Sequence, residues 1–311
     1  MSALATHSIP VILDTDIGDD IDDTWALAML LRCPELDLRL VTTDMGREEY
    51  RARLSARLLD VAGRSDVPVG LGCAVPTVTG IGDQALWVAD YPLESYPGTI
   101  IKDGTGAMIE TIMSSPVPVT IIAIGPLPTV AAALEREPRI ARNARFVGMH
   151  GSFYRTYGGE AGRAREYNVD AHPVSCTAVF AAPWLSATIT PLDTCGTVQL
   201  TGVQYQRVLT GSDPLMRAVI DNYRIWCESR NTPLWEEVST VLFDTVAVHL
   251  AWSRDYLACR TTGVSIADNG LTVEDPDGAP FEVAFDWTNE AGYRDYLVER
   301  LLMPIVPPQR H

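Results

Sequence analysis

The chain has 311 residues and a formal net charge of −16, with 24 basic side chains against 40 acidic ones. This length suits a single α/β domain with a large core, so we expect residues 1–311 to form one domain. A chain this acidic repels phosphodiester backbones and anionic lipid surfaces, which excludes non-specific binding to nucleic acid or membranes and favours a small-molecule partner.

Targeting signals and disulfide patterns are both missing from the sequence. Residues 1–10 lack the basic segment and apolar core of a signal peptide, and no apolar run is long enough to span a bilayer. We therefore expect a cytoplasmic protein. The six cysteines are scattered singly, with no Cys-x-x-Cys pair, which is typical of buried thiols.

Short runs rich in β-branched residues alternate with longer helical patterns up to about residue 200. The predicted strands are Val11–Thr15, Leu38–Thr43, Val67–Leu71, Val117–Ile124, Ala144–Met149 and Ala187–Pro191. The predicted helices between them are Asp22–Arg32, Glu48–Ala62, Gly104–Ser114, Pro128–Arg136 and Pro173–Ala181. Such alternation predicts an α/β fold, with an open, mostly parallel sheet flanked by helices on both faces.

The pattern changes in the remaining part of the chain. Helices are predicted at Gln204–Leu209, Pro214–Glu228 and Ser239–Trp252, followed by a closing helix near Glu290–Leu302. The segment Asp268-Asn269-Gly270 is a typical hairpin turn. We therefore expect a helical C-terminal part with one small hairpin.

An acidic segment separates the first predicted strand from the first predicted helix. Six carboxylates fall within ten residues in Asp14-Thr15-Asp16-Ile17-Gly18-Asp19-Asp20-Ile21-Asp22-Asp23. Capping a helix and complementing its dipole needs only one or two acids, so the excess indicates a bound cation. Carboxylate oxygens without neighbouring His or Cys ligands suit a hard ion, Ca²⁺ or Mg²⁺.

Polar and turn-forming residues follow several of the other predicted strands. Ligands of open α/β sheets bind beyond the carboxyl ends of the strands. Those ends carry Asp14 and Asp16, Asp44 and Arg47, Ile124-Gly125-Pro126, Met149-His150-Gly151 and Asp193. A turn explains any single Gly or Pro, but the coincidence of these groups with the acidic segment predicts a binding site on this rim.

The segment Asp14-Thr15-Asp16-x-Gly18, followed by Asp22-Asp23-x-x-Ala26-Leu27, resembles the amino-terminal signature of the inosine-uridine nucleoside hydrolase family. Four further similar segments follow in the family's order: Ile124-Gly125-Pro126-Leu127, Met149-x-Gly151, Glu166-Tyr167-Asn168 and Phe243-Asp244. The resemblance implies a Rossmann-like nucleoside hydrolase fold and Ca²⁺-dependent hydrolysis of the N-glycosidic bond in ribonucleosides or a related ribosyl substrate. It also suggests a homodimer or homotetramer.

The resemblance also implies roles for individual residues. It assigns Ca²⁺ to Asp16, Asp22 or Asp23, Asp244 and the main-chain carbonyl of Ile124. Ribose contacts would come from Glu166 and Asn168, with Met149 under the sugar and Asp14 beside the substrate. Asp16 is then the carboxylate that takes a proton from the attacking water.

Two departures from the family pattern lie near the acidic segment. The stretch between Asp16 and Asp22-Asp23 is two residues longer than the common form, so Asp20 is an alternative to Asp22 as a metal ligand. Arg47 stands where the family has a sugar-contacting Asn. Arg47 either binds an anionic or oxygen-rich part of the substrate, or is a solvated helix-start residue paired with Asp44.

The third departure concerns the leaving base. Phe243 stands where many members have a His that helps the base to depart. His150, at the end of the fifth predicted strand, is our candidate for the missing acid; the alternative is a hydrogen-bonded His that closes the strand. Trp87, Tyr91, Tyr154 and Tyr157 are candidates to stack on a base. These departures also allow a second function, a Ca²⁺-dependent nucleoside- or sugar-binding protein that has lost turnover.

Overall fold

The computed structural model describes residues 8–76, 78 and 80–305. The strands are β1 (Ile9–Thr15), β2 (Leu36–Thr43), β3 (Val69–Gly70), β4 (Ile100–Ile101), β5 (Val119–Ala123), β6 (Ala144–Met149), β7 (Ala187–Thr190), β8 (Gln199–Thr201), β9 (Val238–Val241), β10 (Leu257–Ile266), β11 (Thr272–Glu274) and β12 (Ala279–Trp287). The α-helices are α1 (Asp22–Leu30), α2 (Glu48–Val61), α3 (Gly104–Ser114), α4 (Pro128–Arg136), α5 (Tyr167–Ala171), α6 (Pro173–Phe180), α7 (Leu192–Cys195), α8 (Gly202–Leu209), α9 (Pro214–Ser229), α10 (Asp244–Leu250) and α11 (Glu290–Leu302).

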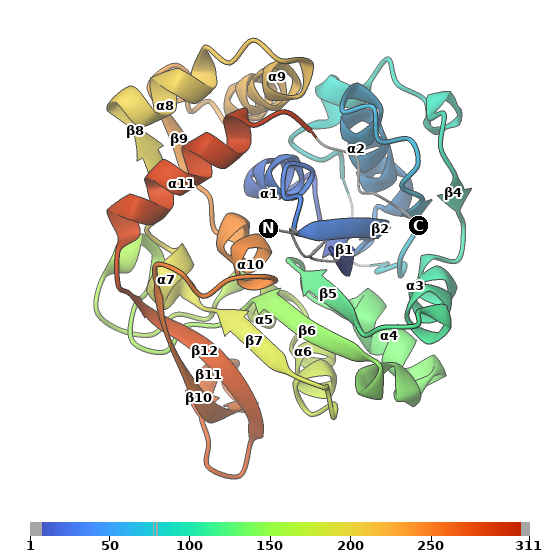
Figure 1. The fold of residues 1–311 in the computed structure, drawn as a ribbon, viewed down its shortest axis with the longest axis vertical. Helices are drawn as coiled ribbons and strands as arrows, with labels where there is room; N and C mark the ends of the chain where they lie inside the picture. Colours follow the sequence, from blue (N-terminus) through green and yellow to red (C-terminus); the bar gives the residue numbers. More distant parts are fainter. Residues whose placement is uncertain (1–7, 77, 79, 306–311) are drawn as a thin grey trace, which may run out of the picture.

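A ten-stranded sheet in the order β11-β10-β12-β7-β6-β5-β1-β2-β3-β4 forms the centre of the molecule (Figure 1). Every neighbouring pair from β4 to β12 is parallel, and only β10 and β11 run antiparallel to their neighbours. The predicted open, mostly parallel α/β sheet is therefore confirmed. Because the connections are parallel crossovers, the loops that follow β1, β2, β5 and β6 all emerge at one edge.

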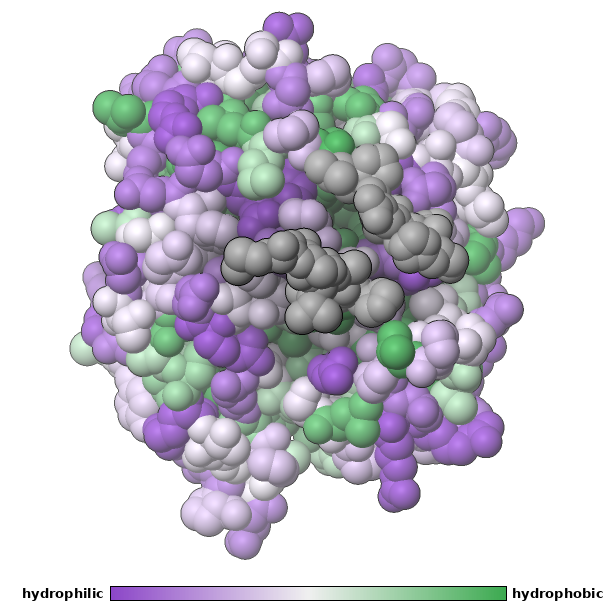
Figure 2. Space-filling model, viewed as in Figure 1, coloured by the Kyte–Doolittle hydropathy of each residue, from purple (hydrophilic) through white to green (hydrophobic). Residues whose placement is uncertain are grey.

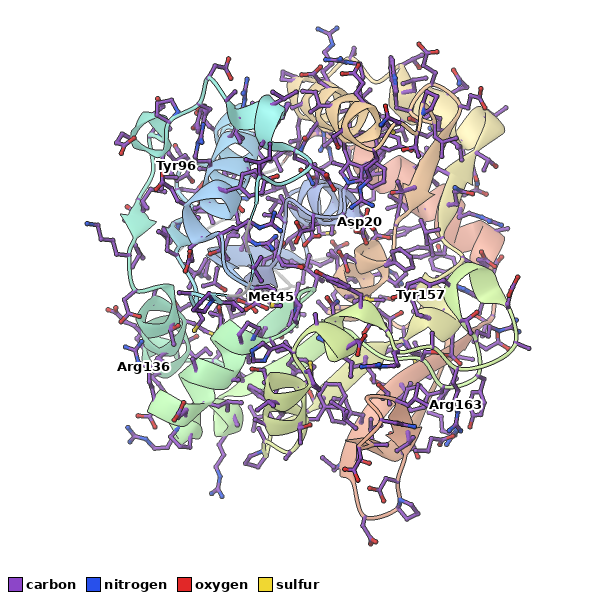
Figure 3. The ribbon with its side chains drawn as sticks, turned by 180° about the vertical axis from the view of Figure 1, so that it is seen from behind. Asp20, Met45, Tyr96, Arg136, Tyr157 and Arg163 are labelled. Carbon is purple, nitrogen blue, oxygen red and sulfur yellow. The ribbon has the colours of Figure 1, made fainter. Side chains whose placement is uncertain are left out.

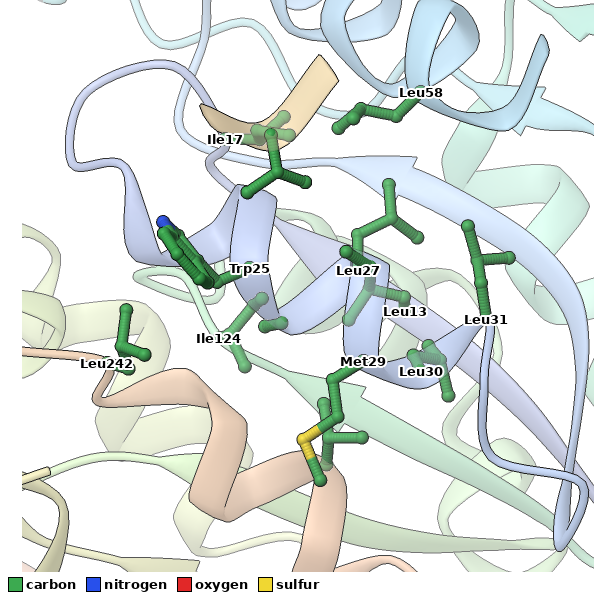
Figure 4. Close-up of a cluster of buried hydrophobic side chains, with 14 of the residues drawn as sticks. Leu13, Ile17, Trp25, Leu27, Met29, Leu30, Leu31, Leu58, Ile124 and Leu242 are labelled. Carbon is green, nitrogen blue, oxygen red and sulfur yellow. The ribbon is translucent and has the colours of Figure 1, made fainter. Parts of the chain in front are cut away.

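Helices cover both faces of this sheet. Helices α1, α2 and α10 lie on one face, and α3, α4 and α6 lie on the other (Figure 1). Successive residues of a strand point to opposite faces, so Leu13 of β1 belongs to the first core and its neighbour Ile12 to the second. Figure 4 shows the first core, where Trp25 and Leu27 of α1 pack near Leu13 and Ile124. Burial on both faces explains the unbroken apolar runs of the central strands.

Several predicted elements differ from the structure. The predicted helix Ser239–Trp252 is wrong at its start, because the β-branched segment Val238–Val241 forms β9 and pairs with β8, and α10 begins only at Asp244. The turn at Asp268-Asn269-Gly270 does join two antiparallel strands, β10 and β11. The prediction missed β12, which pairs with both β10 and β7 and so attaches the hairpin to the main sheet.

The surface and the cysteines complete the description of the fold. In the described part of the chain, no helix is both long and apolar enough to cross a membrane. On the face shown in Figure 2, apolar side chains are interspersed with hydrophilic ones. All six cysteines are unpaired; four are buried as predicted, whereas Cys73 and Cys259 are only partly buried.

Candidate active site

A cavity of about 550 Å³ lies at the carboxyl ends of the central strands. It is lined by Asp16, Asp19, Asp20, Asp22, Asp23, Arg47, Ile124, Met149, Tyr157, Glu166, Tyr167, Asn168, Arg230, Phe243 and Asp244. Figure 3, which views the molecule from behind, labels two of these residues, Asp20 and Tyr157, in its central part. The volume is in the range of pockets that enclose a small ligand.

Three acidic side chains converge in this cavity. Asp22 and Asp23 begin α1, Asp244 begins α10, and the two helices pack together. One carboxylate oxygen of each residue lies within 4.8 Å of the other two. The N–H of Asp244 donates to Oδ2 of Asp22 at 3.3 Å, and the hydroxyl of Thr15 donates to Oδ1 of Asp23 at 2.5 Å. The packing of two helix N-termini therefore joins acids that are far apart in the sequence.

The charge of these three acids requires compensation. All three are buried, and burial raises the pKa of each carboxyl group well above its usual value, while repulsion between the aspartates raises it further. A set of carboxylate oxygens with no His or Cys among the lining residues matches the preference of a hard cation. The donor set therefore fits Ca²⁺ or Mg²⁺ and not Zn²⁺.

Two other predicted ligands lie on the wall of the same cavity. The carboxylate of Asp20 accepts a hydrogen bond from the N–H of Ile21 at 2.7 Å and lies outside the converging group, so the geometry favours Asp22 over Asp20. The main-chain oxygen of Ile124 accepts from Nδ2 of Asn168 at 3.2 Å. Since a carbonyl oxygen has two lone pairs, it retains one for a cation.

Asp14 belongs to β1, whereas Asp16 is the first residue after the strand, and the two side chains have different surroundings. Asp16 lines the cavity, and burial raises its pKa to about 7 despite the opposing charge of the Arg51 guanidinium. Asp14 is buried outside the lining, where its Oδ1 accepts from the hydroxyl of Thr42 on β2 at 2.5 Å. The prediction that Asp14 contacts substrate is therefore not supported, because its side chain faces the neighbouring strand.

The residues predicted to hold ribose form a connected group. The carboxylate of Glu166 accepts from the N–H groups of Gly151, Asn168 and Val169 at 3.0, 2.7 and 3.2 Å, which fixes the start of α5. Nδ2 of Asn168 donates to the main-chain oxygen of Met149 at 3.0 Å. Asn168 lines the cavity and no described residue donates to its Oδ1, whereas Glu166 already accepts from three backbone donors.

Aromatic side chains form another part of the wall. Phe243 and Tyr157 meet edge to face, with ring centroids 6.0 Å apart. The hydroxyl of Tyr157 accepts from the N–H of Tyr167 at 2.9 Å. No described residue accepts from the O–H of Tyr157, so this donor is available to a ligand. Of the aromatic candidates named from the sequence, only Tyr157 lies among the described lining residues.

His150 does not reach the cavity. It is fully buried against the rings of Phe146 and Phe180, and its Nε2 lies 3.1 Å from the main-chain oxygen of Gly125. Burial lowers its pKa to about 4, so the ring is neutral near pH 7. The prediction of His150 as the acid for the leaving base is corrected: its side chain turns toward the second core, and the alternative of a hydrogen-bonded strand-end His fits.

Two arginines line the cavity. Arg47 forms an ion pair with Asp19, while Asp44 instead caps α4 by accepting from the N–H groups of Leu127 and Thr129 at 2.7 and 2.9 Å. The predicted pairing of Arg47 with Asp44 is therefore wrong. Arg230, just after α9, was not predicted as a site residue because no motif marks it. Its guanidinium stacks 4.4 Å from the centroid of the Trp226 ring.

Comparisons with known proteins agree with this architecture. The family described as inosine-uridine preferring nucleoside hydrolase matches residues 11–293. Non-specific ribonucleoside hydrolase RihC of Salmonella newport is 34% identical over 188 residues, which are 56% of this chain and 58% of that protein. The chain thus spans little more than half the length of the curated relatives that it matches.

Solved structures extend the likeness over nearly the whole fold. A plant nucleoside hydrolase superposes with a TM-score of 0.79 at 22% identity, covering 95% of this chain and 99% of that one. An inosine-uridine preferring nucleoside hydrolase from Bacillus anthracis gives a TM-score of 0.75 at 21% identity, covering 94% and 99%. A purine-preferring ribonucleoside hydrolase from Gardnerella vaginalis gives 0.76 at 20% identity, covering 94% and 98%.

Proposed function

Because the chain belongs to the inosine-uridine preferring nucleoside hydrolase family, we propose that it hydrolyses the N-glycosidic bond of ribonucleosides or a related ribosyl substrate in a Ca²⁺-dependent reaction. The observation that carries the proposal is the convergence of Asp22, Asp23 and Asp244 within 4.8 Å, in a cavity that Asp16 also lines. The products are ribose and the free base. Retention of all these acids favours hydrolysis over a binding-only role.

The cation would be held by Asp22, Asp23 and Asp244, with Asp16 and the main-chain oxygen of Ile124 completing the set. When bound, Ca²⁺ supplies the positive charge that offsets the repulsion among these carboxylates, attracts the ribose hydroxyls and makes a nearby water more acidic. Its preference for six to eight oxygen ligands leaves room for substrate and water besides the protein ligands.

Asp16 is the general base of the proposed reaction. A water oxygen forms the new bond to C1′ while the carboxylate of Asp16, which lines the cavity beside the converging acids, takes its proton. The C1′–N bond breaks, and its electron pair stays on the base nitrogen. The surrounding carboxylates stabilise the positive charge that develops on the sugar. The Oδ1 of Asn168 accepts a hydrogen bond from a ribose hydroxyl, and Met149 supports the sugar from below.

The leaving base needs a hydrogen bond because its nitrogen gains negative charge. The side chain of Phe243 has no proton to offer, but the adjacent Tyr157 has an O–H that is not used by the bond from Tyr167. We assign this hydrogen bond to Tyr157. Since burial raises the pKa of Tyr157 to about 12, it stabilises the departing base by hydrogen bonding, and the base takes its proton from solvent.

The direct test is to incubate the protein with Ca²⁺ and a panel of ribonucleosides, nucleotides and modified nucleosides, and to assay free ribose. Release of ribose that stops after chelation and resumes with Ca²⁺ supports the proposal. Ligand binding without any product would instead support the nucleoside- or sugar-binding role. The predicted homodimer or homotetramer stays a prediction, which sedimentation of the purified protein would test.

A further inference from the structure

Arg47 enters the cavity from a strained part of the backbone. Met45, Gly46 and Arg47 all have positive φ angles, of 52°, 67° and 49°. Such angles are unfavourable for side chains other than Gly, Asn and Asp, and they persist where the surrounding structure imposes them. The main-chain oxygens of Met45 and Gly46 both accept from the guanidinium of Arg51, at 3.4 and 2.9 Å, which fixes the turn.

Asp19, one of the acids in the lengthened loop, anchors the Arg47 side chain. Its carboxylate pairs with Arg47 through one oxygen and with Arg51 through the other, the latter at 2.8 Å. Its main-chain oxygen accepts from Nε1 of Trp226 at 2.8 Å and from Nη2 of Arg230 at 3.1 Å. One carboxylate is thus shared by two guanidinium groups, and the loop that carries it is tied to the end of α9.

The two arginines that share Asp19 differ in how completely they are bonded. Arg51 has a fully buried side chain, and each of its guanidinium nitrogens donates to an oxygen, Nε to Gly46, Nη1 to Ile17 and Nη2 to Asp19. Arg47 donates only through Nη2, and its buried Nε has no partner among the described residues. The Arg47 side chain is 14% exposed and lines the cavity. Arg51 therefore has the bonding of a structural arginine, and Arg47 does not.

We propose that Arg47 is a specificity-determining residue that binds an oxyanion of the substrate, either a carboxylate on the base or a phosphate on the ribose. This inference rests on the proposed function. Planar guanidinium groups recognise planar oxyanions through paired hydrogen bonds, and Arg47 has donors left for such a group. The side chain of Arg230, which is 41% exposed and pairs with Asp83 at 2.8 Å, places a second guanidinium at the same cavity. A neutral nucleoside uses neither charge.

Three substrates separate the possible sources of the oxyanion: uridine, orotidine, which carries a carboxylate on the same base, and uridine 5′-monophosphate. Arg47→Asn is the informative variant because Asn tolerates a positive φ. The control is Arg57→Gln, which removes an arginine of α2 that pairs with Asp90 outside the cavity lining. We divide kcat/KM for the anionic substrate by kcat/KM for uridine. Arg47→Asn should lower this ratio about 10- to 100-fold, which corresponds to the loss of one charge-assisted hydrogen bond. The loss should lie mainly in KM.

Loss of the orotidine preference assigns Arg47 to a base carboxylate, and loss of the nucleotide preference assigns it to a phosphate. The proposal would be overturned if Arg47→Asn lost the same activity on all three substrates. It would also be overturned if wild type preferred uridine and the variant kept that preference. If no compound releases ribose, the proposed function fails, and calorimetric titration of the same three compounds still tests Arg47. An anion bound about tenfold or more tighter by wild type than by Arg47→Asn supports the role. Equal affinities reject it.

Discussion

Removal of the bound cation should destabilise the protein measurably, because Asp22, Asp23 and Asp244 repel one another without it. We expect the melting temperature to fall when the purified protein is exhaustively chelated. Ca²⁺ should restore it more effectively than Zn²⁺, since the cavity offers oxygen ligands and neither His nor Cys among its lining residues. Asp244→Asn should remove most of the response to Ca²⁺.

The size of the effect follows from binding to the native state alone. Free Ca²⁺ at about 1,000 times its dissociation constant stabilises a protein by about 4 kcal/mol. With roughly 2.1 cal/mol/K of unfolding entropy per residue, a chain of 311 residues has an unfolding entropy of about 650 cal/mol/K at the transition. Chelation should therefore lower the melting temperature by about 6 °C. In the chelated state, Asp244→Asn should melt at or above wild type, because one of the repelling charges is gone.

Differential scanning calorimetry of wild type, Asp244→Asn and a matched control measures these shifts. Asp221→Asn is a suitable control, because Asp221 is an exposed acid of α9 that pairs with Arg224 away from the cavity lining. It should keep the full response to Ca²⁺. A wild-type curve that chelation leaves unchanged, together with elemental analysis that finds no metal, would refute the reasoning. So would a full Ca²⁺ response in Asp244→Asn.

Four further predictions concern single residues of the cavity and its surroundings. Asp16→Asn should lower turnover at least about 10²-fold while folding survives, as judged by ribose release and circular dichroism; wild-type turnover would exclude Asp16 as the base. Tyr157→Phe should slow ordinary nucleosides far more than p-nitrophenyl riboside, whose phenolate leaves without help; equal effects would remove Tyr157 from the leaving-group role. Burial raises the pKa of Glu166 from 4.5 to about 7, so its contribution to the free energy of unfolding declines as pH rises through that interval. Denaturant titrations should show wild type losing stability relative to Glu166→Gln from about pH 5 to 7, and parallel profiles would contradict the shift. His150→Gln should lower the melting temperature but leave unchanged the ratio of its activity on nucleosides to its activity on p-nitrophenyl riboside. A selective loss of activity on nucleosides would instead support His150 as the acid for the leaving base.

Much of the sheet and its rim could be predicted from local sequence. Strands buried on both faces produce continuous apolar runs, and helices such as α3 and α4 have clear starts in Asp103 and Pro128, so their predicted bounds match the structure. The predicted strand Val67–Leu71 contains β3, whereas the edge strand β4 was missed because its two residues are too few for a periodic pattern. The β12 pairing could not be predicted either, because it depends on contacts with β7, far away in the sequence.

Side-chain direction was harder to predict than rim position. His150 follows β6 at the expected edge, yet its ring turns into the aromatic core around Phe146 and Phe180. One residue of register decides which face a side chain occupies at the end of a strand, and sequence alone leaves that choice open. Arg230 was missed for a different reason. It reaches the cavity only because α9 packs beside α1 and α2, a tertiary contact with no local signal.

The six acids between β1 and α1 carry out separate tasks, and this division explains why their number exceeds the needs of one cation. Asp14 bonds to the neighbouring strand through Thr42, and Asp19 pairs with two arginines. Only Asp22 and Asp23 converge with a distant third acid, Asp244. The excess of acids in the sequence therefore predicts a cation site, but only part of the segment contributes to the converging group. The lengthened loop supplies Asp19, the partner of Arg47, so the two departures from the family pattern form one contact in the folded protein. We propose that a change in the recognised substrate, rather than a loss of the hydrolytic machinery, accounts for both.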